Sequence, residues 1–253
     1  MTIDAPRRDQ LPALRALWHE AFGDSEEFLN VFEETAFSAD RCRCITADGT
    51  VAAALYWFNC EYRQERMAYL YAIATAKEHR GKGLCSALME NTHLHLKALG
   101  YIGTVLVPSS KELFAFYQRL GYQTCGGIGE LNCSASAEGT EVRQINADEY
   151  ARLRRRLLPK DSVIQEKENL SFLQAQATLY AGDGFLLAAR REKDTLFGVE
   201  LLGDTTKAPG IVQTLGCTKG RFRIPKNERP FAMYYSLSDA TLPPPAYFGL
   251  AFD

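Results

Sequence analysis

The hydrophobic residues near the N-terminus recur every three or four positions. Over residues 8–22 this spacing predicts an amphipathic helix. Gly23 and Asp24 interrupt the pattern, and Ser25 is placed to cap a second helix. The apolar positions of the two predicted helices are Leu11, Leu14, Leu17, Trp18, Ala21, Phe28, Leu29 and Phe32.

The pattern then changes to one typical of β-strands. Residues 41–46 and 51–62 predict a hairpin, with Asp48 and Gly49 as its tight-turn dipeptide. A second turn near 63–65 leads into an apolar strand over 67–75. We therefore expect three strands that follow one another in a meander.

Helices and strands alternate after this meander. A helix is expected to run to about Ala98, with Gly100 as its stop. Its expected buried side consists of Leu84, Leu88, Leu94 and Ala98. A strand follows over 101–108, then a helix that ends at Gly121, with Ser109 and Glu112 at capping-box spacing. The order predicts an α+β fold, in which a mostly antiparallel sheet turns parallel around one crossover helix.

The C-terminal part repeats this plan in pattern more than in identity. The predicted order is a strand, two helices, a hairpin and two further strands. They are expected at 141–145, 146–158, 171–180, 184–203, 211–217 and 247–253. The polar segment Asn132–Thr140 is the expected boundary, so we predict one domain over 1–135 and a truncated, degenerate copy over 136–253.

Composition excludes some classes of protein. A formal net charge of −2 and a pI near 6.1 argue against a nucleic-acid binder that neutralises phosphates. The three arginines within 153–158 are interpreted as a solvated helix face. No stretch is apolar enough for a membrane span or a signal peptide, which predicts a cytoplasmic protein. The seven cysteines lack zinc-site spacing, so we expect free thiols and no metal.

The segment EHRGKGLCSALM at 78–89 follows a predicted strand and opens a helix. A helix N-terminus offers unpaired N–H groups and a partial positive charge, and glycines there let an anion approach the backbone. Gly81 and Gly83 are equally compatible with a tight turn alone. The pattern also departs from the GxGxxG nucleotide fingerprint, because Ser86 stands at its last position.

Two motifs, in order, resemble those of the GNAT acetyltransferase superfamily over residues 1–131. The first is the family's R/Q-x-x-G-x-G/A, with Arg80, Gly83 and Cys85 at its positions; Cys85 replaces the usual Gly or Ala. The second is SKELFAFYQRLGY, which resembles N-x-x-A-x-x-F-Y-x-x-x-G-F/Y. It matches at Phe116, Tyr117, Gly121 and Tyr122, and departs at Ser110 and Leu113.

The resemblance implies acetyl-CoA as co-substrate, bound where the fourth and fifth strands splay apart. Backbone groups of Ile73 and Thr75 would pair with the pantetheine. The pyrophosphate would lie on the turn formed by Arg80, Gly81, Lys82, Gly83, Leu84, Cys85 and Ser86. A primary amine of a small molecule or peptide would then attack the thioester directly.

Tyr117 is the acid that the resemblance implies, because a phenol is protonated at neutral pH. A core aromatic residue is the alternative. The base is open, since Tyr69 stands where histone-modifying relatives have a strand glutamate. Glu61 and Glu65 are alternatives that could equally be solvent-facing. The tandem layout also resembles the enhanced-intracellular-survival type of acetyltransferase, which adds the terminal carboxylate of Asp253 as a hypothesis.

The acceptor itself is not predicted. Asp24, Glu26 and Glu27 could attract an amine or simply serve as helix-capping and surface charges. A catalytically silent acyl-CoA-binding or interaction module is the alternative function. The second unit lacks a phosphate turn, so we expect it to close the acceptor pocket or to form a dimer surface, and PPP at 243–245 to be a stiff connector.

Overall fold

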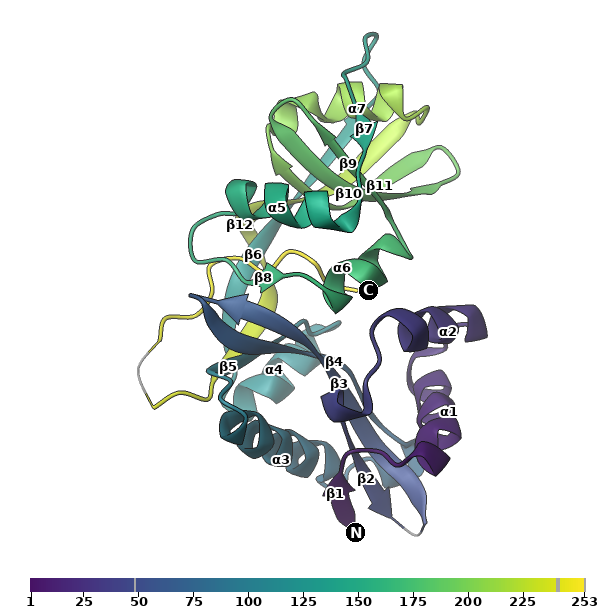
Figure 1. The fold of residues 1–253 in the computed structure, drawn as a ribbon, viewed down its shortest axis with the longest axis vertical. Coiled ribbons are helices and arrows are strands. Elements are labelled where there is room, and N and C mark those ends of the chain that lie inside the picture. The colour runs from purple at the N-terminus through teal and green to yellow at the C-terminus, as the bar shows by residue number, and fades with distance from the viewer. Residues whose placement is uncertain (48, 240–241, 253) are drawn as a thin grey trace. The chain divides into compact units, whose positions relative to one another are not determined.

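The structure is a computed structural model that describes residues 1–47, 49–239 and 242–252 (Figure 1). The helices are α1 Leu11–Phe22, α2 Glu26–Thr35, α3 Leu84–Ala98, α4 Lys111–Arg119, α5 Ala147–Leu157, α6 Glu168–Gln174 and α7 Ala208–Thr214, with short 3₁₀ helices η1 Arg8–Gln10, η2 Ala39–Arg41, η3 Lys77–His79 and η4 Thr205–Lys207. The strands are β1 Thr2–Asp4, β2 Cys42–Ala47, β3 Thr50–Tyr62, β4 Glu65–Thr75, β5 Gly103–Leu106, β6 Gln123–Ser134, β7 Arg143–Gln144, β8 Ile164–Gln165, β9 Thr178–Gly182, β10 Phe185–Glu192, β11 Thr195–Gly203 and β12 Lys219–Ser236.

The chain forms two compact units, each assembled from two segments. Unit 1 consists of Met1–Gln123 and Tyr234–Pro243, and unit 2 of Thr124–Met233 and Pro244–Asp253. Strand β12 therefore contributes its last residues to unit 1 and the rest to unit 2. The domain boundary at residue 135 that the sequence suggests stays a prediction.

Unit 1 is built on the mixed sheet that the sequence predicts. Its strands lie in the order β1-β2-β3-β4-β5, antiparallel up to β4 and parallel between β4 and β5. Helices cover both faces (Figure 1). Trp18 of α1 packs on Tyr56 of β3, whereas the next residue, Trp57, packs on His95 of α3. The alternation of a strand therefore gives one face to α1–α2 and the other to α3.

The first two helices form as predicted. Gly23 ends α1 with a φ of 73°, a left-handed conformation that glycine adopts without strain. The Ser25 hydroxyl accepts a hydrogen bond from the Phe28 N–H and caps α2. The β2–β3 hairpin is also present, but the predicted turn residue Asp48 lies outside the described residues.

Two details of α3 and α4 were predicted wrongly. The buried face of α3 includes Leu84, Leu88 and Leu96, while Leu94 is 65% exposed and Ala98 is exposed. The four-residue spacing from Leu84 runs through 88, 92 and 96, so Leu94 falls on the opposite side. The cap of α4 is Ser110, whose hydroxyl accepts from the Leu113 N–H, and not Ser109.

In unit 2 the strands lie in the order β12-β11-β10-β9-β7, with β6 also paired to β12. Strands β7, β9, β10 and β11 pair antiparallel, whereas β11 and β12 pair parallel. Helices α5 and α7 lie on opposite faces of these strands (Figure 1). The core on the α7 side contains Phe185, Leu187, Leu201, Ile211, Val212 and Phe222.

Three elements of unit 2 differ from the prediction. Helix α6 ends at Gln174, and the following residues form β9, in which buried and half-buried side chains alternate. Residues 211–217 were expected as a strand, but they lie largely in α7, where Pro209 stands in the first turn. The predicted strand over 247–253 is absent from 247–252; there the Gln165 side chain bonds the Leu250 N–H and carbonyl at 3.1 and 2.6 Å.

The arginines of α5 were also predicted wrongly in part. Arg155 and Arg156 are exposed, but Arg154 is 1% exposed and forms a bidentate ion pair with the buried Glu200, at 2.7 and 2.9 Å. The hydroxyls of Tyr150 and Tyr247 also donate to Glu200, both at 3.1 Å. The carboxylate is thus compensated by one cation and two hydroxyls, which is what a buried charge requires.

All seven cysteines are free thiols. Within the described ranges, no three His, Cys, Asp or Glu side chains lie together as metal ligands would. No helix in the described part of the chain is long and apolar enough to cross a membrane.

Candidate functional site

The C-terminal part of β4 extends beyond its pairing with β5. Strand β4 pairs with β5 from Met67 to Tyr69, and β4 itself continues to Thr75. A bulge marks the change: Ala72 has a φ of 48°, and the register with β3 shifts between Ala54 and Tyr56. A bulge re-aims a strand, and this one lies in the part of β4 that continues beyond its pairing with β5.

The backbone of this part of β4 is placed for an extended ligand. The Thr75 carbonyl points away from β3, because it accepts the Arg80 Nε–H at 3.0 Å. Ile73 lies two residues earlier, so the alternation of a strand directs its backbone groups to the same edge. The edge can therefore supply hydrogen bonds to a chain such as pantetheine, with the Thr75 carbonyl already shared with Arg80.

The turn after β4 is open to solvent where an anion would approach. Gly81, Lys82 and Gly83 are exposed, and the two glycines have φ values of 74° and 78°. A methyl group built on either glycine would meet no atom within 4 Å. Gly83 is the N-cap of α3 and offers no side-chain cap, so the first N–H groups of the helix have no hydroxyl or carboxylate from this position. A diphosphate fits this arrangement.

The first turn of α3 adds neutral groups. Leu84 is buried and anchors the helix start, while Cys85 and Ser86 are half-buried. Burial raises the pKa of the Cys85 thiol to about 11. The thiol is thus uncharged at neutral pH and would not repel a phosphate. Cys85 therefore meets the requirement for a small, neutral residue at this motif position.

Tyr117 lies on α4, and its phenol interacts electrostatically with the Cys85 thiol when both ionise. Burial raises the pKa of the Tyr117 phenol, and the Cys85 thiol adds to this shift, so the phenol keeps its proton through the neutral range. Its side chain is 6% exposed, and its hydroxyl forms no hydrogen bond with a described residue. The oxygen is also not fully buried. Its proton is therefore available to an incoming group.

A buried polar network supports the end of α4 and was not predicted. The Tyr122 hydroxyl lies 2.8 Å from His93 Nε2 and 2.8 Å from Thr104 Oγ1. Tyr235 stacks on the His93 ring at 4.2 Å, and the Tyr122 N–H donates to the Tyr117 carbonyl at 3.1 Å. Burial lowers the pKa of His93 to about 4, so the network is neutral at pH 7. It joins α3, β5 and the residues that follow α4.

The opposite face of the sheet, under α1 and α2, is aromatic. Trp18 contacts Tyr56 and Tyr71 at 5.1 and 5.7 Å between ring centroids. Tyr69, at the position of the family's strand glutamate, is 3% exposed and stacks on Phe58 at 5.7 Å. The place of an acidic base is thus occupied by a buried phenol within a cluster of rings.

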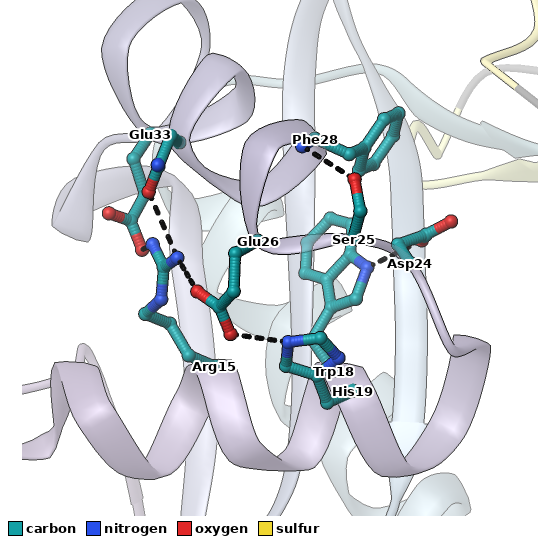
Figure 2. A network of polar contacts seen from close by, with 9 residues as sticks. Arg15, Trp18, His19, Asp24, Ser25, Glu26, Phe28 and Glu33 are labelled. Atoms are coloured by element: carbon teal, nitrogen blue, oxygen red, sulfur yellow. Dashed lines mark hydrogen bonds and ion pairs between the residues drawn. The ribbon is translucent and has the colours of Figure 1, made fainter.

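Two of the acidic residues at the α1–α2 junction, Asp24 and Glu26, are paired with residues of α1 (Figure 2). Glu26 binds Arg15 and His19, and Asp24 accepts the indole N–H of Trp18 at 2.8 Å. Arg15 also pairs with Glu33 at 2.7 Å. These contacts join α1 to α2, so the capping and surface interpretation of Asp24 and Glu26 is the one that the contacts support.

Glu61 and Glu65, two of the carboxylates proposed as the base, lie at the end of the β3–β4 hairpin that is remote from Thr75. Glu61 on β3 is half-buried and faces Arg66 across the β3–β4 register, nine residues along β4 from Thr75. It shares its face of the strand with Trp57, the α3 face, whereas Tyr69 stacks on the α1–α2 face. Glu65 is exposed at the start of β4. Asp253 lies outside the described residues.

Comparisons with known proteins agree with this architecture. Residues 2–125, just under half of the chain, match the family model described as an acetyltransferase (GNAT) domain. No curated protein matches the chain.

Three solved structures illustrate the similarity of fold. A GCN5-related N-acetyltransferase from Kribbella flavida is 16% identical with a TM-score of 0.73, over 93% of this chain and 72% of that chain. One from Anabaena variabilis is 15% identical with a TM-score of 0.71, over 94% and 73%. Eis1 from Mycobacterium abscessus is 12% identical with a TM-score of 0.66, over 94% and 74%. At these identities the likeness shows the fold alone.

Proposed function

We propose that this protein is an N-acetyltransferase that transfers an acetyl group from acetyl-CoA to a primary amine. One observation carries the proposal: the uncapped glycine turn at the start of α3 lies beside a buried phenol that keeps its proton, Tyr117. The GNAT match over residues 2–125 covers both features. A mere strand-to-helix turn would require the glycines but not the phenol.

The chain would hold acetyl-CoA chiefly through its backbone. The N–H groups of Gly81 to Cys85 face the pyrophosphate, with the Ser86 hydroxyl as a further donor. Arg80 and Lys82 add positive charge, although Arg80 also anchors the turn through the Thr75 carbonyl. Ile73 and Thr75 bond the pantetheine along the C-terminal part of β4.

The reaction requires the protein to position the two reactants and to supply one proton to the departing thiolate. Bound acetyl-CoA supplies an activated acetyl group, which a neutral amine attacks directly. Holding the two reactants together lowers the entropic part of the barrier. Tyr117 holds a proton at Oη for the departing thiolate. The His93–Thr104–Tyr122 network holds the backbone that follows Tyr117.

For the base we keep two proposals, Glu61 and the terminal carboxylate of Asp253. Exchanging Glu61 for glutamine tests the first. Adding residues beyond Asp253 tests the second, because a displaced carboxylate would no longer reach the amine. Loss of amine-dependent turnover in one variant and not in the other assigns the role.

The experiment that tests the function follows thiol release from acetyl-CoA with a panel of primary amines. For Tyr117→Phe we expect release to fall roughly a hundredfold or more, since general acids contribute about 10²–10⁴, with CoA affinity nearly unchanged. Tyr180→Phe, a half-buried tyrosine of unit 2, is the matched control. A silent binding module would bind CoA and release no thiol in any variant, and unchanged release in Tyr117→Phe would exclude the assigned acid.

We also propose that unit 2 is a degenerate second copy of unit 1. The support is the order of elements: α1 and α2 lie between β1 and the meander β2–β4 in unit 1, and α5 and α6 lie between β7 and the meander β9–β11 in unit 2. In each unit a helix then crosses to a parallel strand. Unit 2 lacks the glycine turn, so it would not hold CoA in the same way.

A further inference from the structure

A cavity of about 230 Å³ lies on the sheet of unit 2. Its lining comes from β6, β10, β11 and β12. Four of its residues are arginines: Arg190, Arg221, Arg223 and Arg229. Glu130 is the single carboxylate among the lining residues that the structure describes. This concentration of one charge is unusual in a chain whose net charge is −2.

The strand register gathers these side chains on one face. Arg190 pairs with Phe197 across β10 and β11, and Phe197 pairs with Arg221 across β11 and β12. The three residues therefore form a row, arginine–phenylalanine–arginine, on adjacent strands. Leu196 and Phe222, their chain neighbours, belong to the core beneath α7. The row thus lies on the sheet face that α7 does not cover.

The arginines of the lining outnumber its carboxylates. Arg221 pairs with Glu130 at 2.8 Å, and this bond is the main reason that the pKa of Glu130 lies below its usual value. Arg190 contacts Glu192 at 3.2 Å. Arg229 is exposed, and it interacts with Glu130 electrostatically and without a hydrogen bond to it. The lining keeps a net positive charge, because four guanidinium groups share one lining carboxylate.

The floor between the arginines is apolar. Phe197 and Val199 are half-buried and line the cavity. Gly198 between them faces the core, where a methyl group would lie 2.3 Å from the Phe222 ring. A guanidinium binds phosphate or carboxylate through two parallel hydrogen bonds, and a hydrocarbon surface adds affinity for a ligand with an organic body.

We propose that this cavity binds a small organic anion that carries at least two phosphate or carboxylate groups. The volume lies somewhat below the roughly 300 Å³ at which ligand pockets usually begin, which suits a compact anion. The arginines hold the charged groups, with Glu130 positioning Arg221, and Phe197 and Val199 contact the organic part. The proposal is independent of the acetyltransferase assignment, because every residue involved belongs to unit 2.

The test is calorimetric titration of the full-length protein with ADP, citrate and inorganic triphosphate. Hydrogen exchange with each probe locates the protected peptides, so that binding at 197–199 and 221–229 is distinguished from binding at the turn 81–86. We expect saturable binding that weakens with added salt. ADP should bind more tightly than inorganic triphosphate, despite its smaller negative charge, if the apolar floor contributes.

The double variant Arg221→Gln/Arg229→Gln should weaken binding at least tenfold, since one hydrogen bond to a charged group contributes about 1.5–3 kcal/mol. Arg152→Gln/Arg156→Gln is the control, because both arginines are exposed on α5 and neither lines the cavity. Circular dichroism confirms that both variants are folded. Equal affinity in the two double variants, protection confined to 81–86, or tighter binding of a single-stranded oligonucleotide than of any small anion would overturn the proposal.

Discussion

The two units of this protein use the same crossover in different ways. In unit 1, β4 leads through α3 to the parallel strand β5, and the N-cap of α3 is Gly83, which contributes no side-chain cap. In unit 2, β11 leads through η4 and α7 to β12, and the Asp204 carboxylate accepts from the Thr206 N–H at 3.0 Å. The crossover of unit 2 thus begins with a carboxylate cap on η4, although α7 itself starts at Lys207 without a side-chain cap, whereas no side chain caps the start of α3 in unit 1.

The interiors differ as well. Unit 1 buries a neutral network of His93, Thr104 and Tyr122. Unit 2 buries the Arg154–Glu200 ion pair; burial works against the charge of Arg154, but Glu200 outweighs it and raises the pKa of the guanidinium. A neutral network depends on pH only where its histidine can be protonated. A buried ion pair fails when either partner is removed.

The largest effect is expected from Glu200→Ala. The substitution leaves the Arg154 guanidinium buried without its counter-ion, and breaking such a pair typically costs about 3–5 kcal/mol. Denaturant unfolding, with hydrogen exchange to locate the loss in unit 2, measures it. The matched control is Glu166→Gln, which removes the partly exposed Arg155–Glu166 pair of the same unit and should cost less than about 1 kcal/mol. Equal losses of unfolding free energy in Glu200→Ala and Glu166→Gln would show that the buried ion pair stabilises unit 2 no more than the partly exposed one does.

A smaller effect is expected from acid in unit 1. Burial lowers the pKa of His93 to about 4, against 6.5 for the unperturbed group. The unfolded chain therefore binds the proton first, so stability is unaffected above pH 6.5 and falls as the pH drops from there towards 4. By pH 5 the loss is about 2 kcal/mol. Unfolding at pH 7 and pH 5, compared between the wild type and His93→Gln, measures it; an identical pH dependence in the variant would exclude His93 as its source.

The smallest effect on stability is expected from Gly83→Ala. A left-handed backbone costs a residue with a side chain about 1–2 kcal/mol, and no neighbouring atom crowds the new methyl group. Gly23→Ala is the control, because Gly23 has a φ of 73° and equally open surroundings outside the turn. Both variants should lose similar stability, but only Gly83→Ala should weaken CoA binding. If Gly23→Ala weakens it as much, the turn is not the binding element.

Local patterns predicted the fold of unit 1 well. The helix α1, the cap at Ser25, the meander and the crossover all depend on residues close in sequence. The glycine turn and Tyr117 are motif residues, and their positions follow from those elements. Leu94 shows the limit, because choosing among apolar positions on a helix requires knowing which side faces the sheet.

What the sequence did not predict depends on distant partners. The sequence around Arg154 predicts a solvent-exposed arginine. Only its pairing with Glu200, 46 residues away, explains why the side chain is buried. The His93–Tyr122 contact spans 29 residues, and although Tyr122 belongs to the second motif, neither motif includes His93. Residues 247–252 look like a strand, but a single glutamine side chain satisfies Leu250 in place of a neighbouring strand. The arginines around the unit 2 cavity come from two strands, β10 and β12, and carry no shared sequence signature.

The division of β12 between the units affects the order in which the chain can fold during synthesis. Tyr235, whose ring stacks on His93, and Tyr234, which fills the space beside Gly103, are made more than a hundred residues after those partners. A nascent chain therefore exposes these partner positions of unit 1 until the end of β12 has been made. Unit 1 begins first but is complete only once residues 234–243 have followed most of unit 2, and a fragment cut between the motifs and β12 would lack part of its own interior.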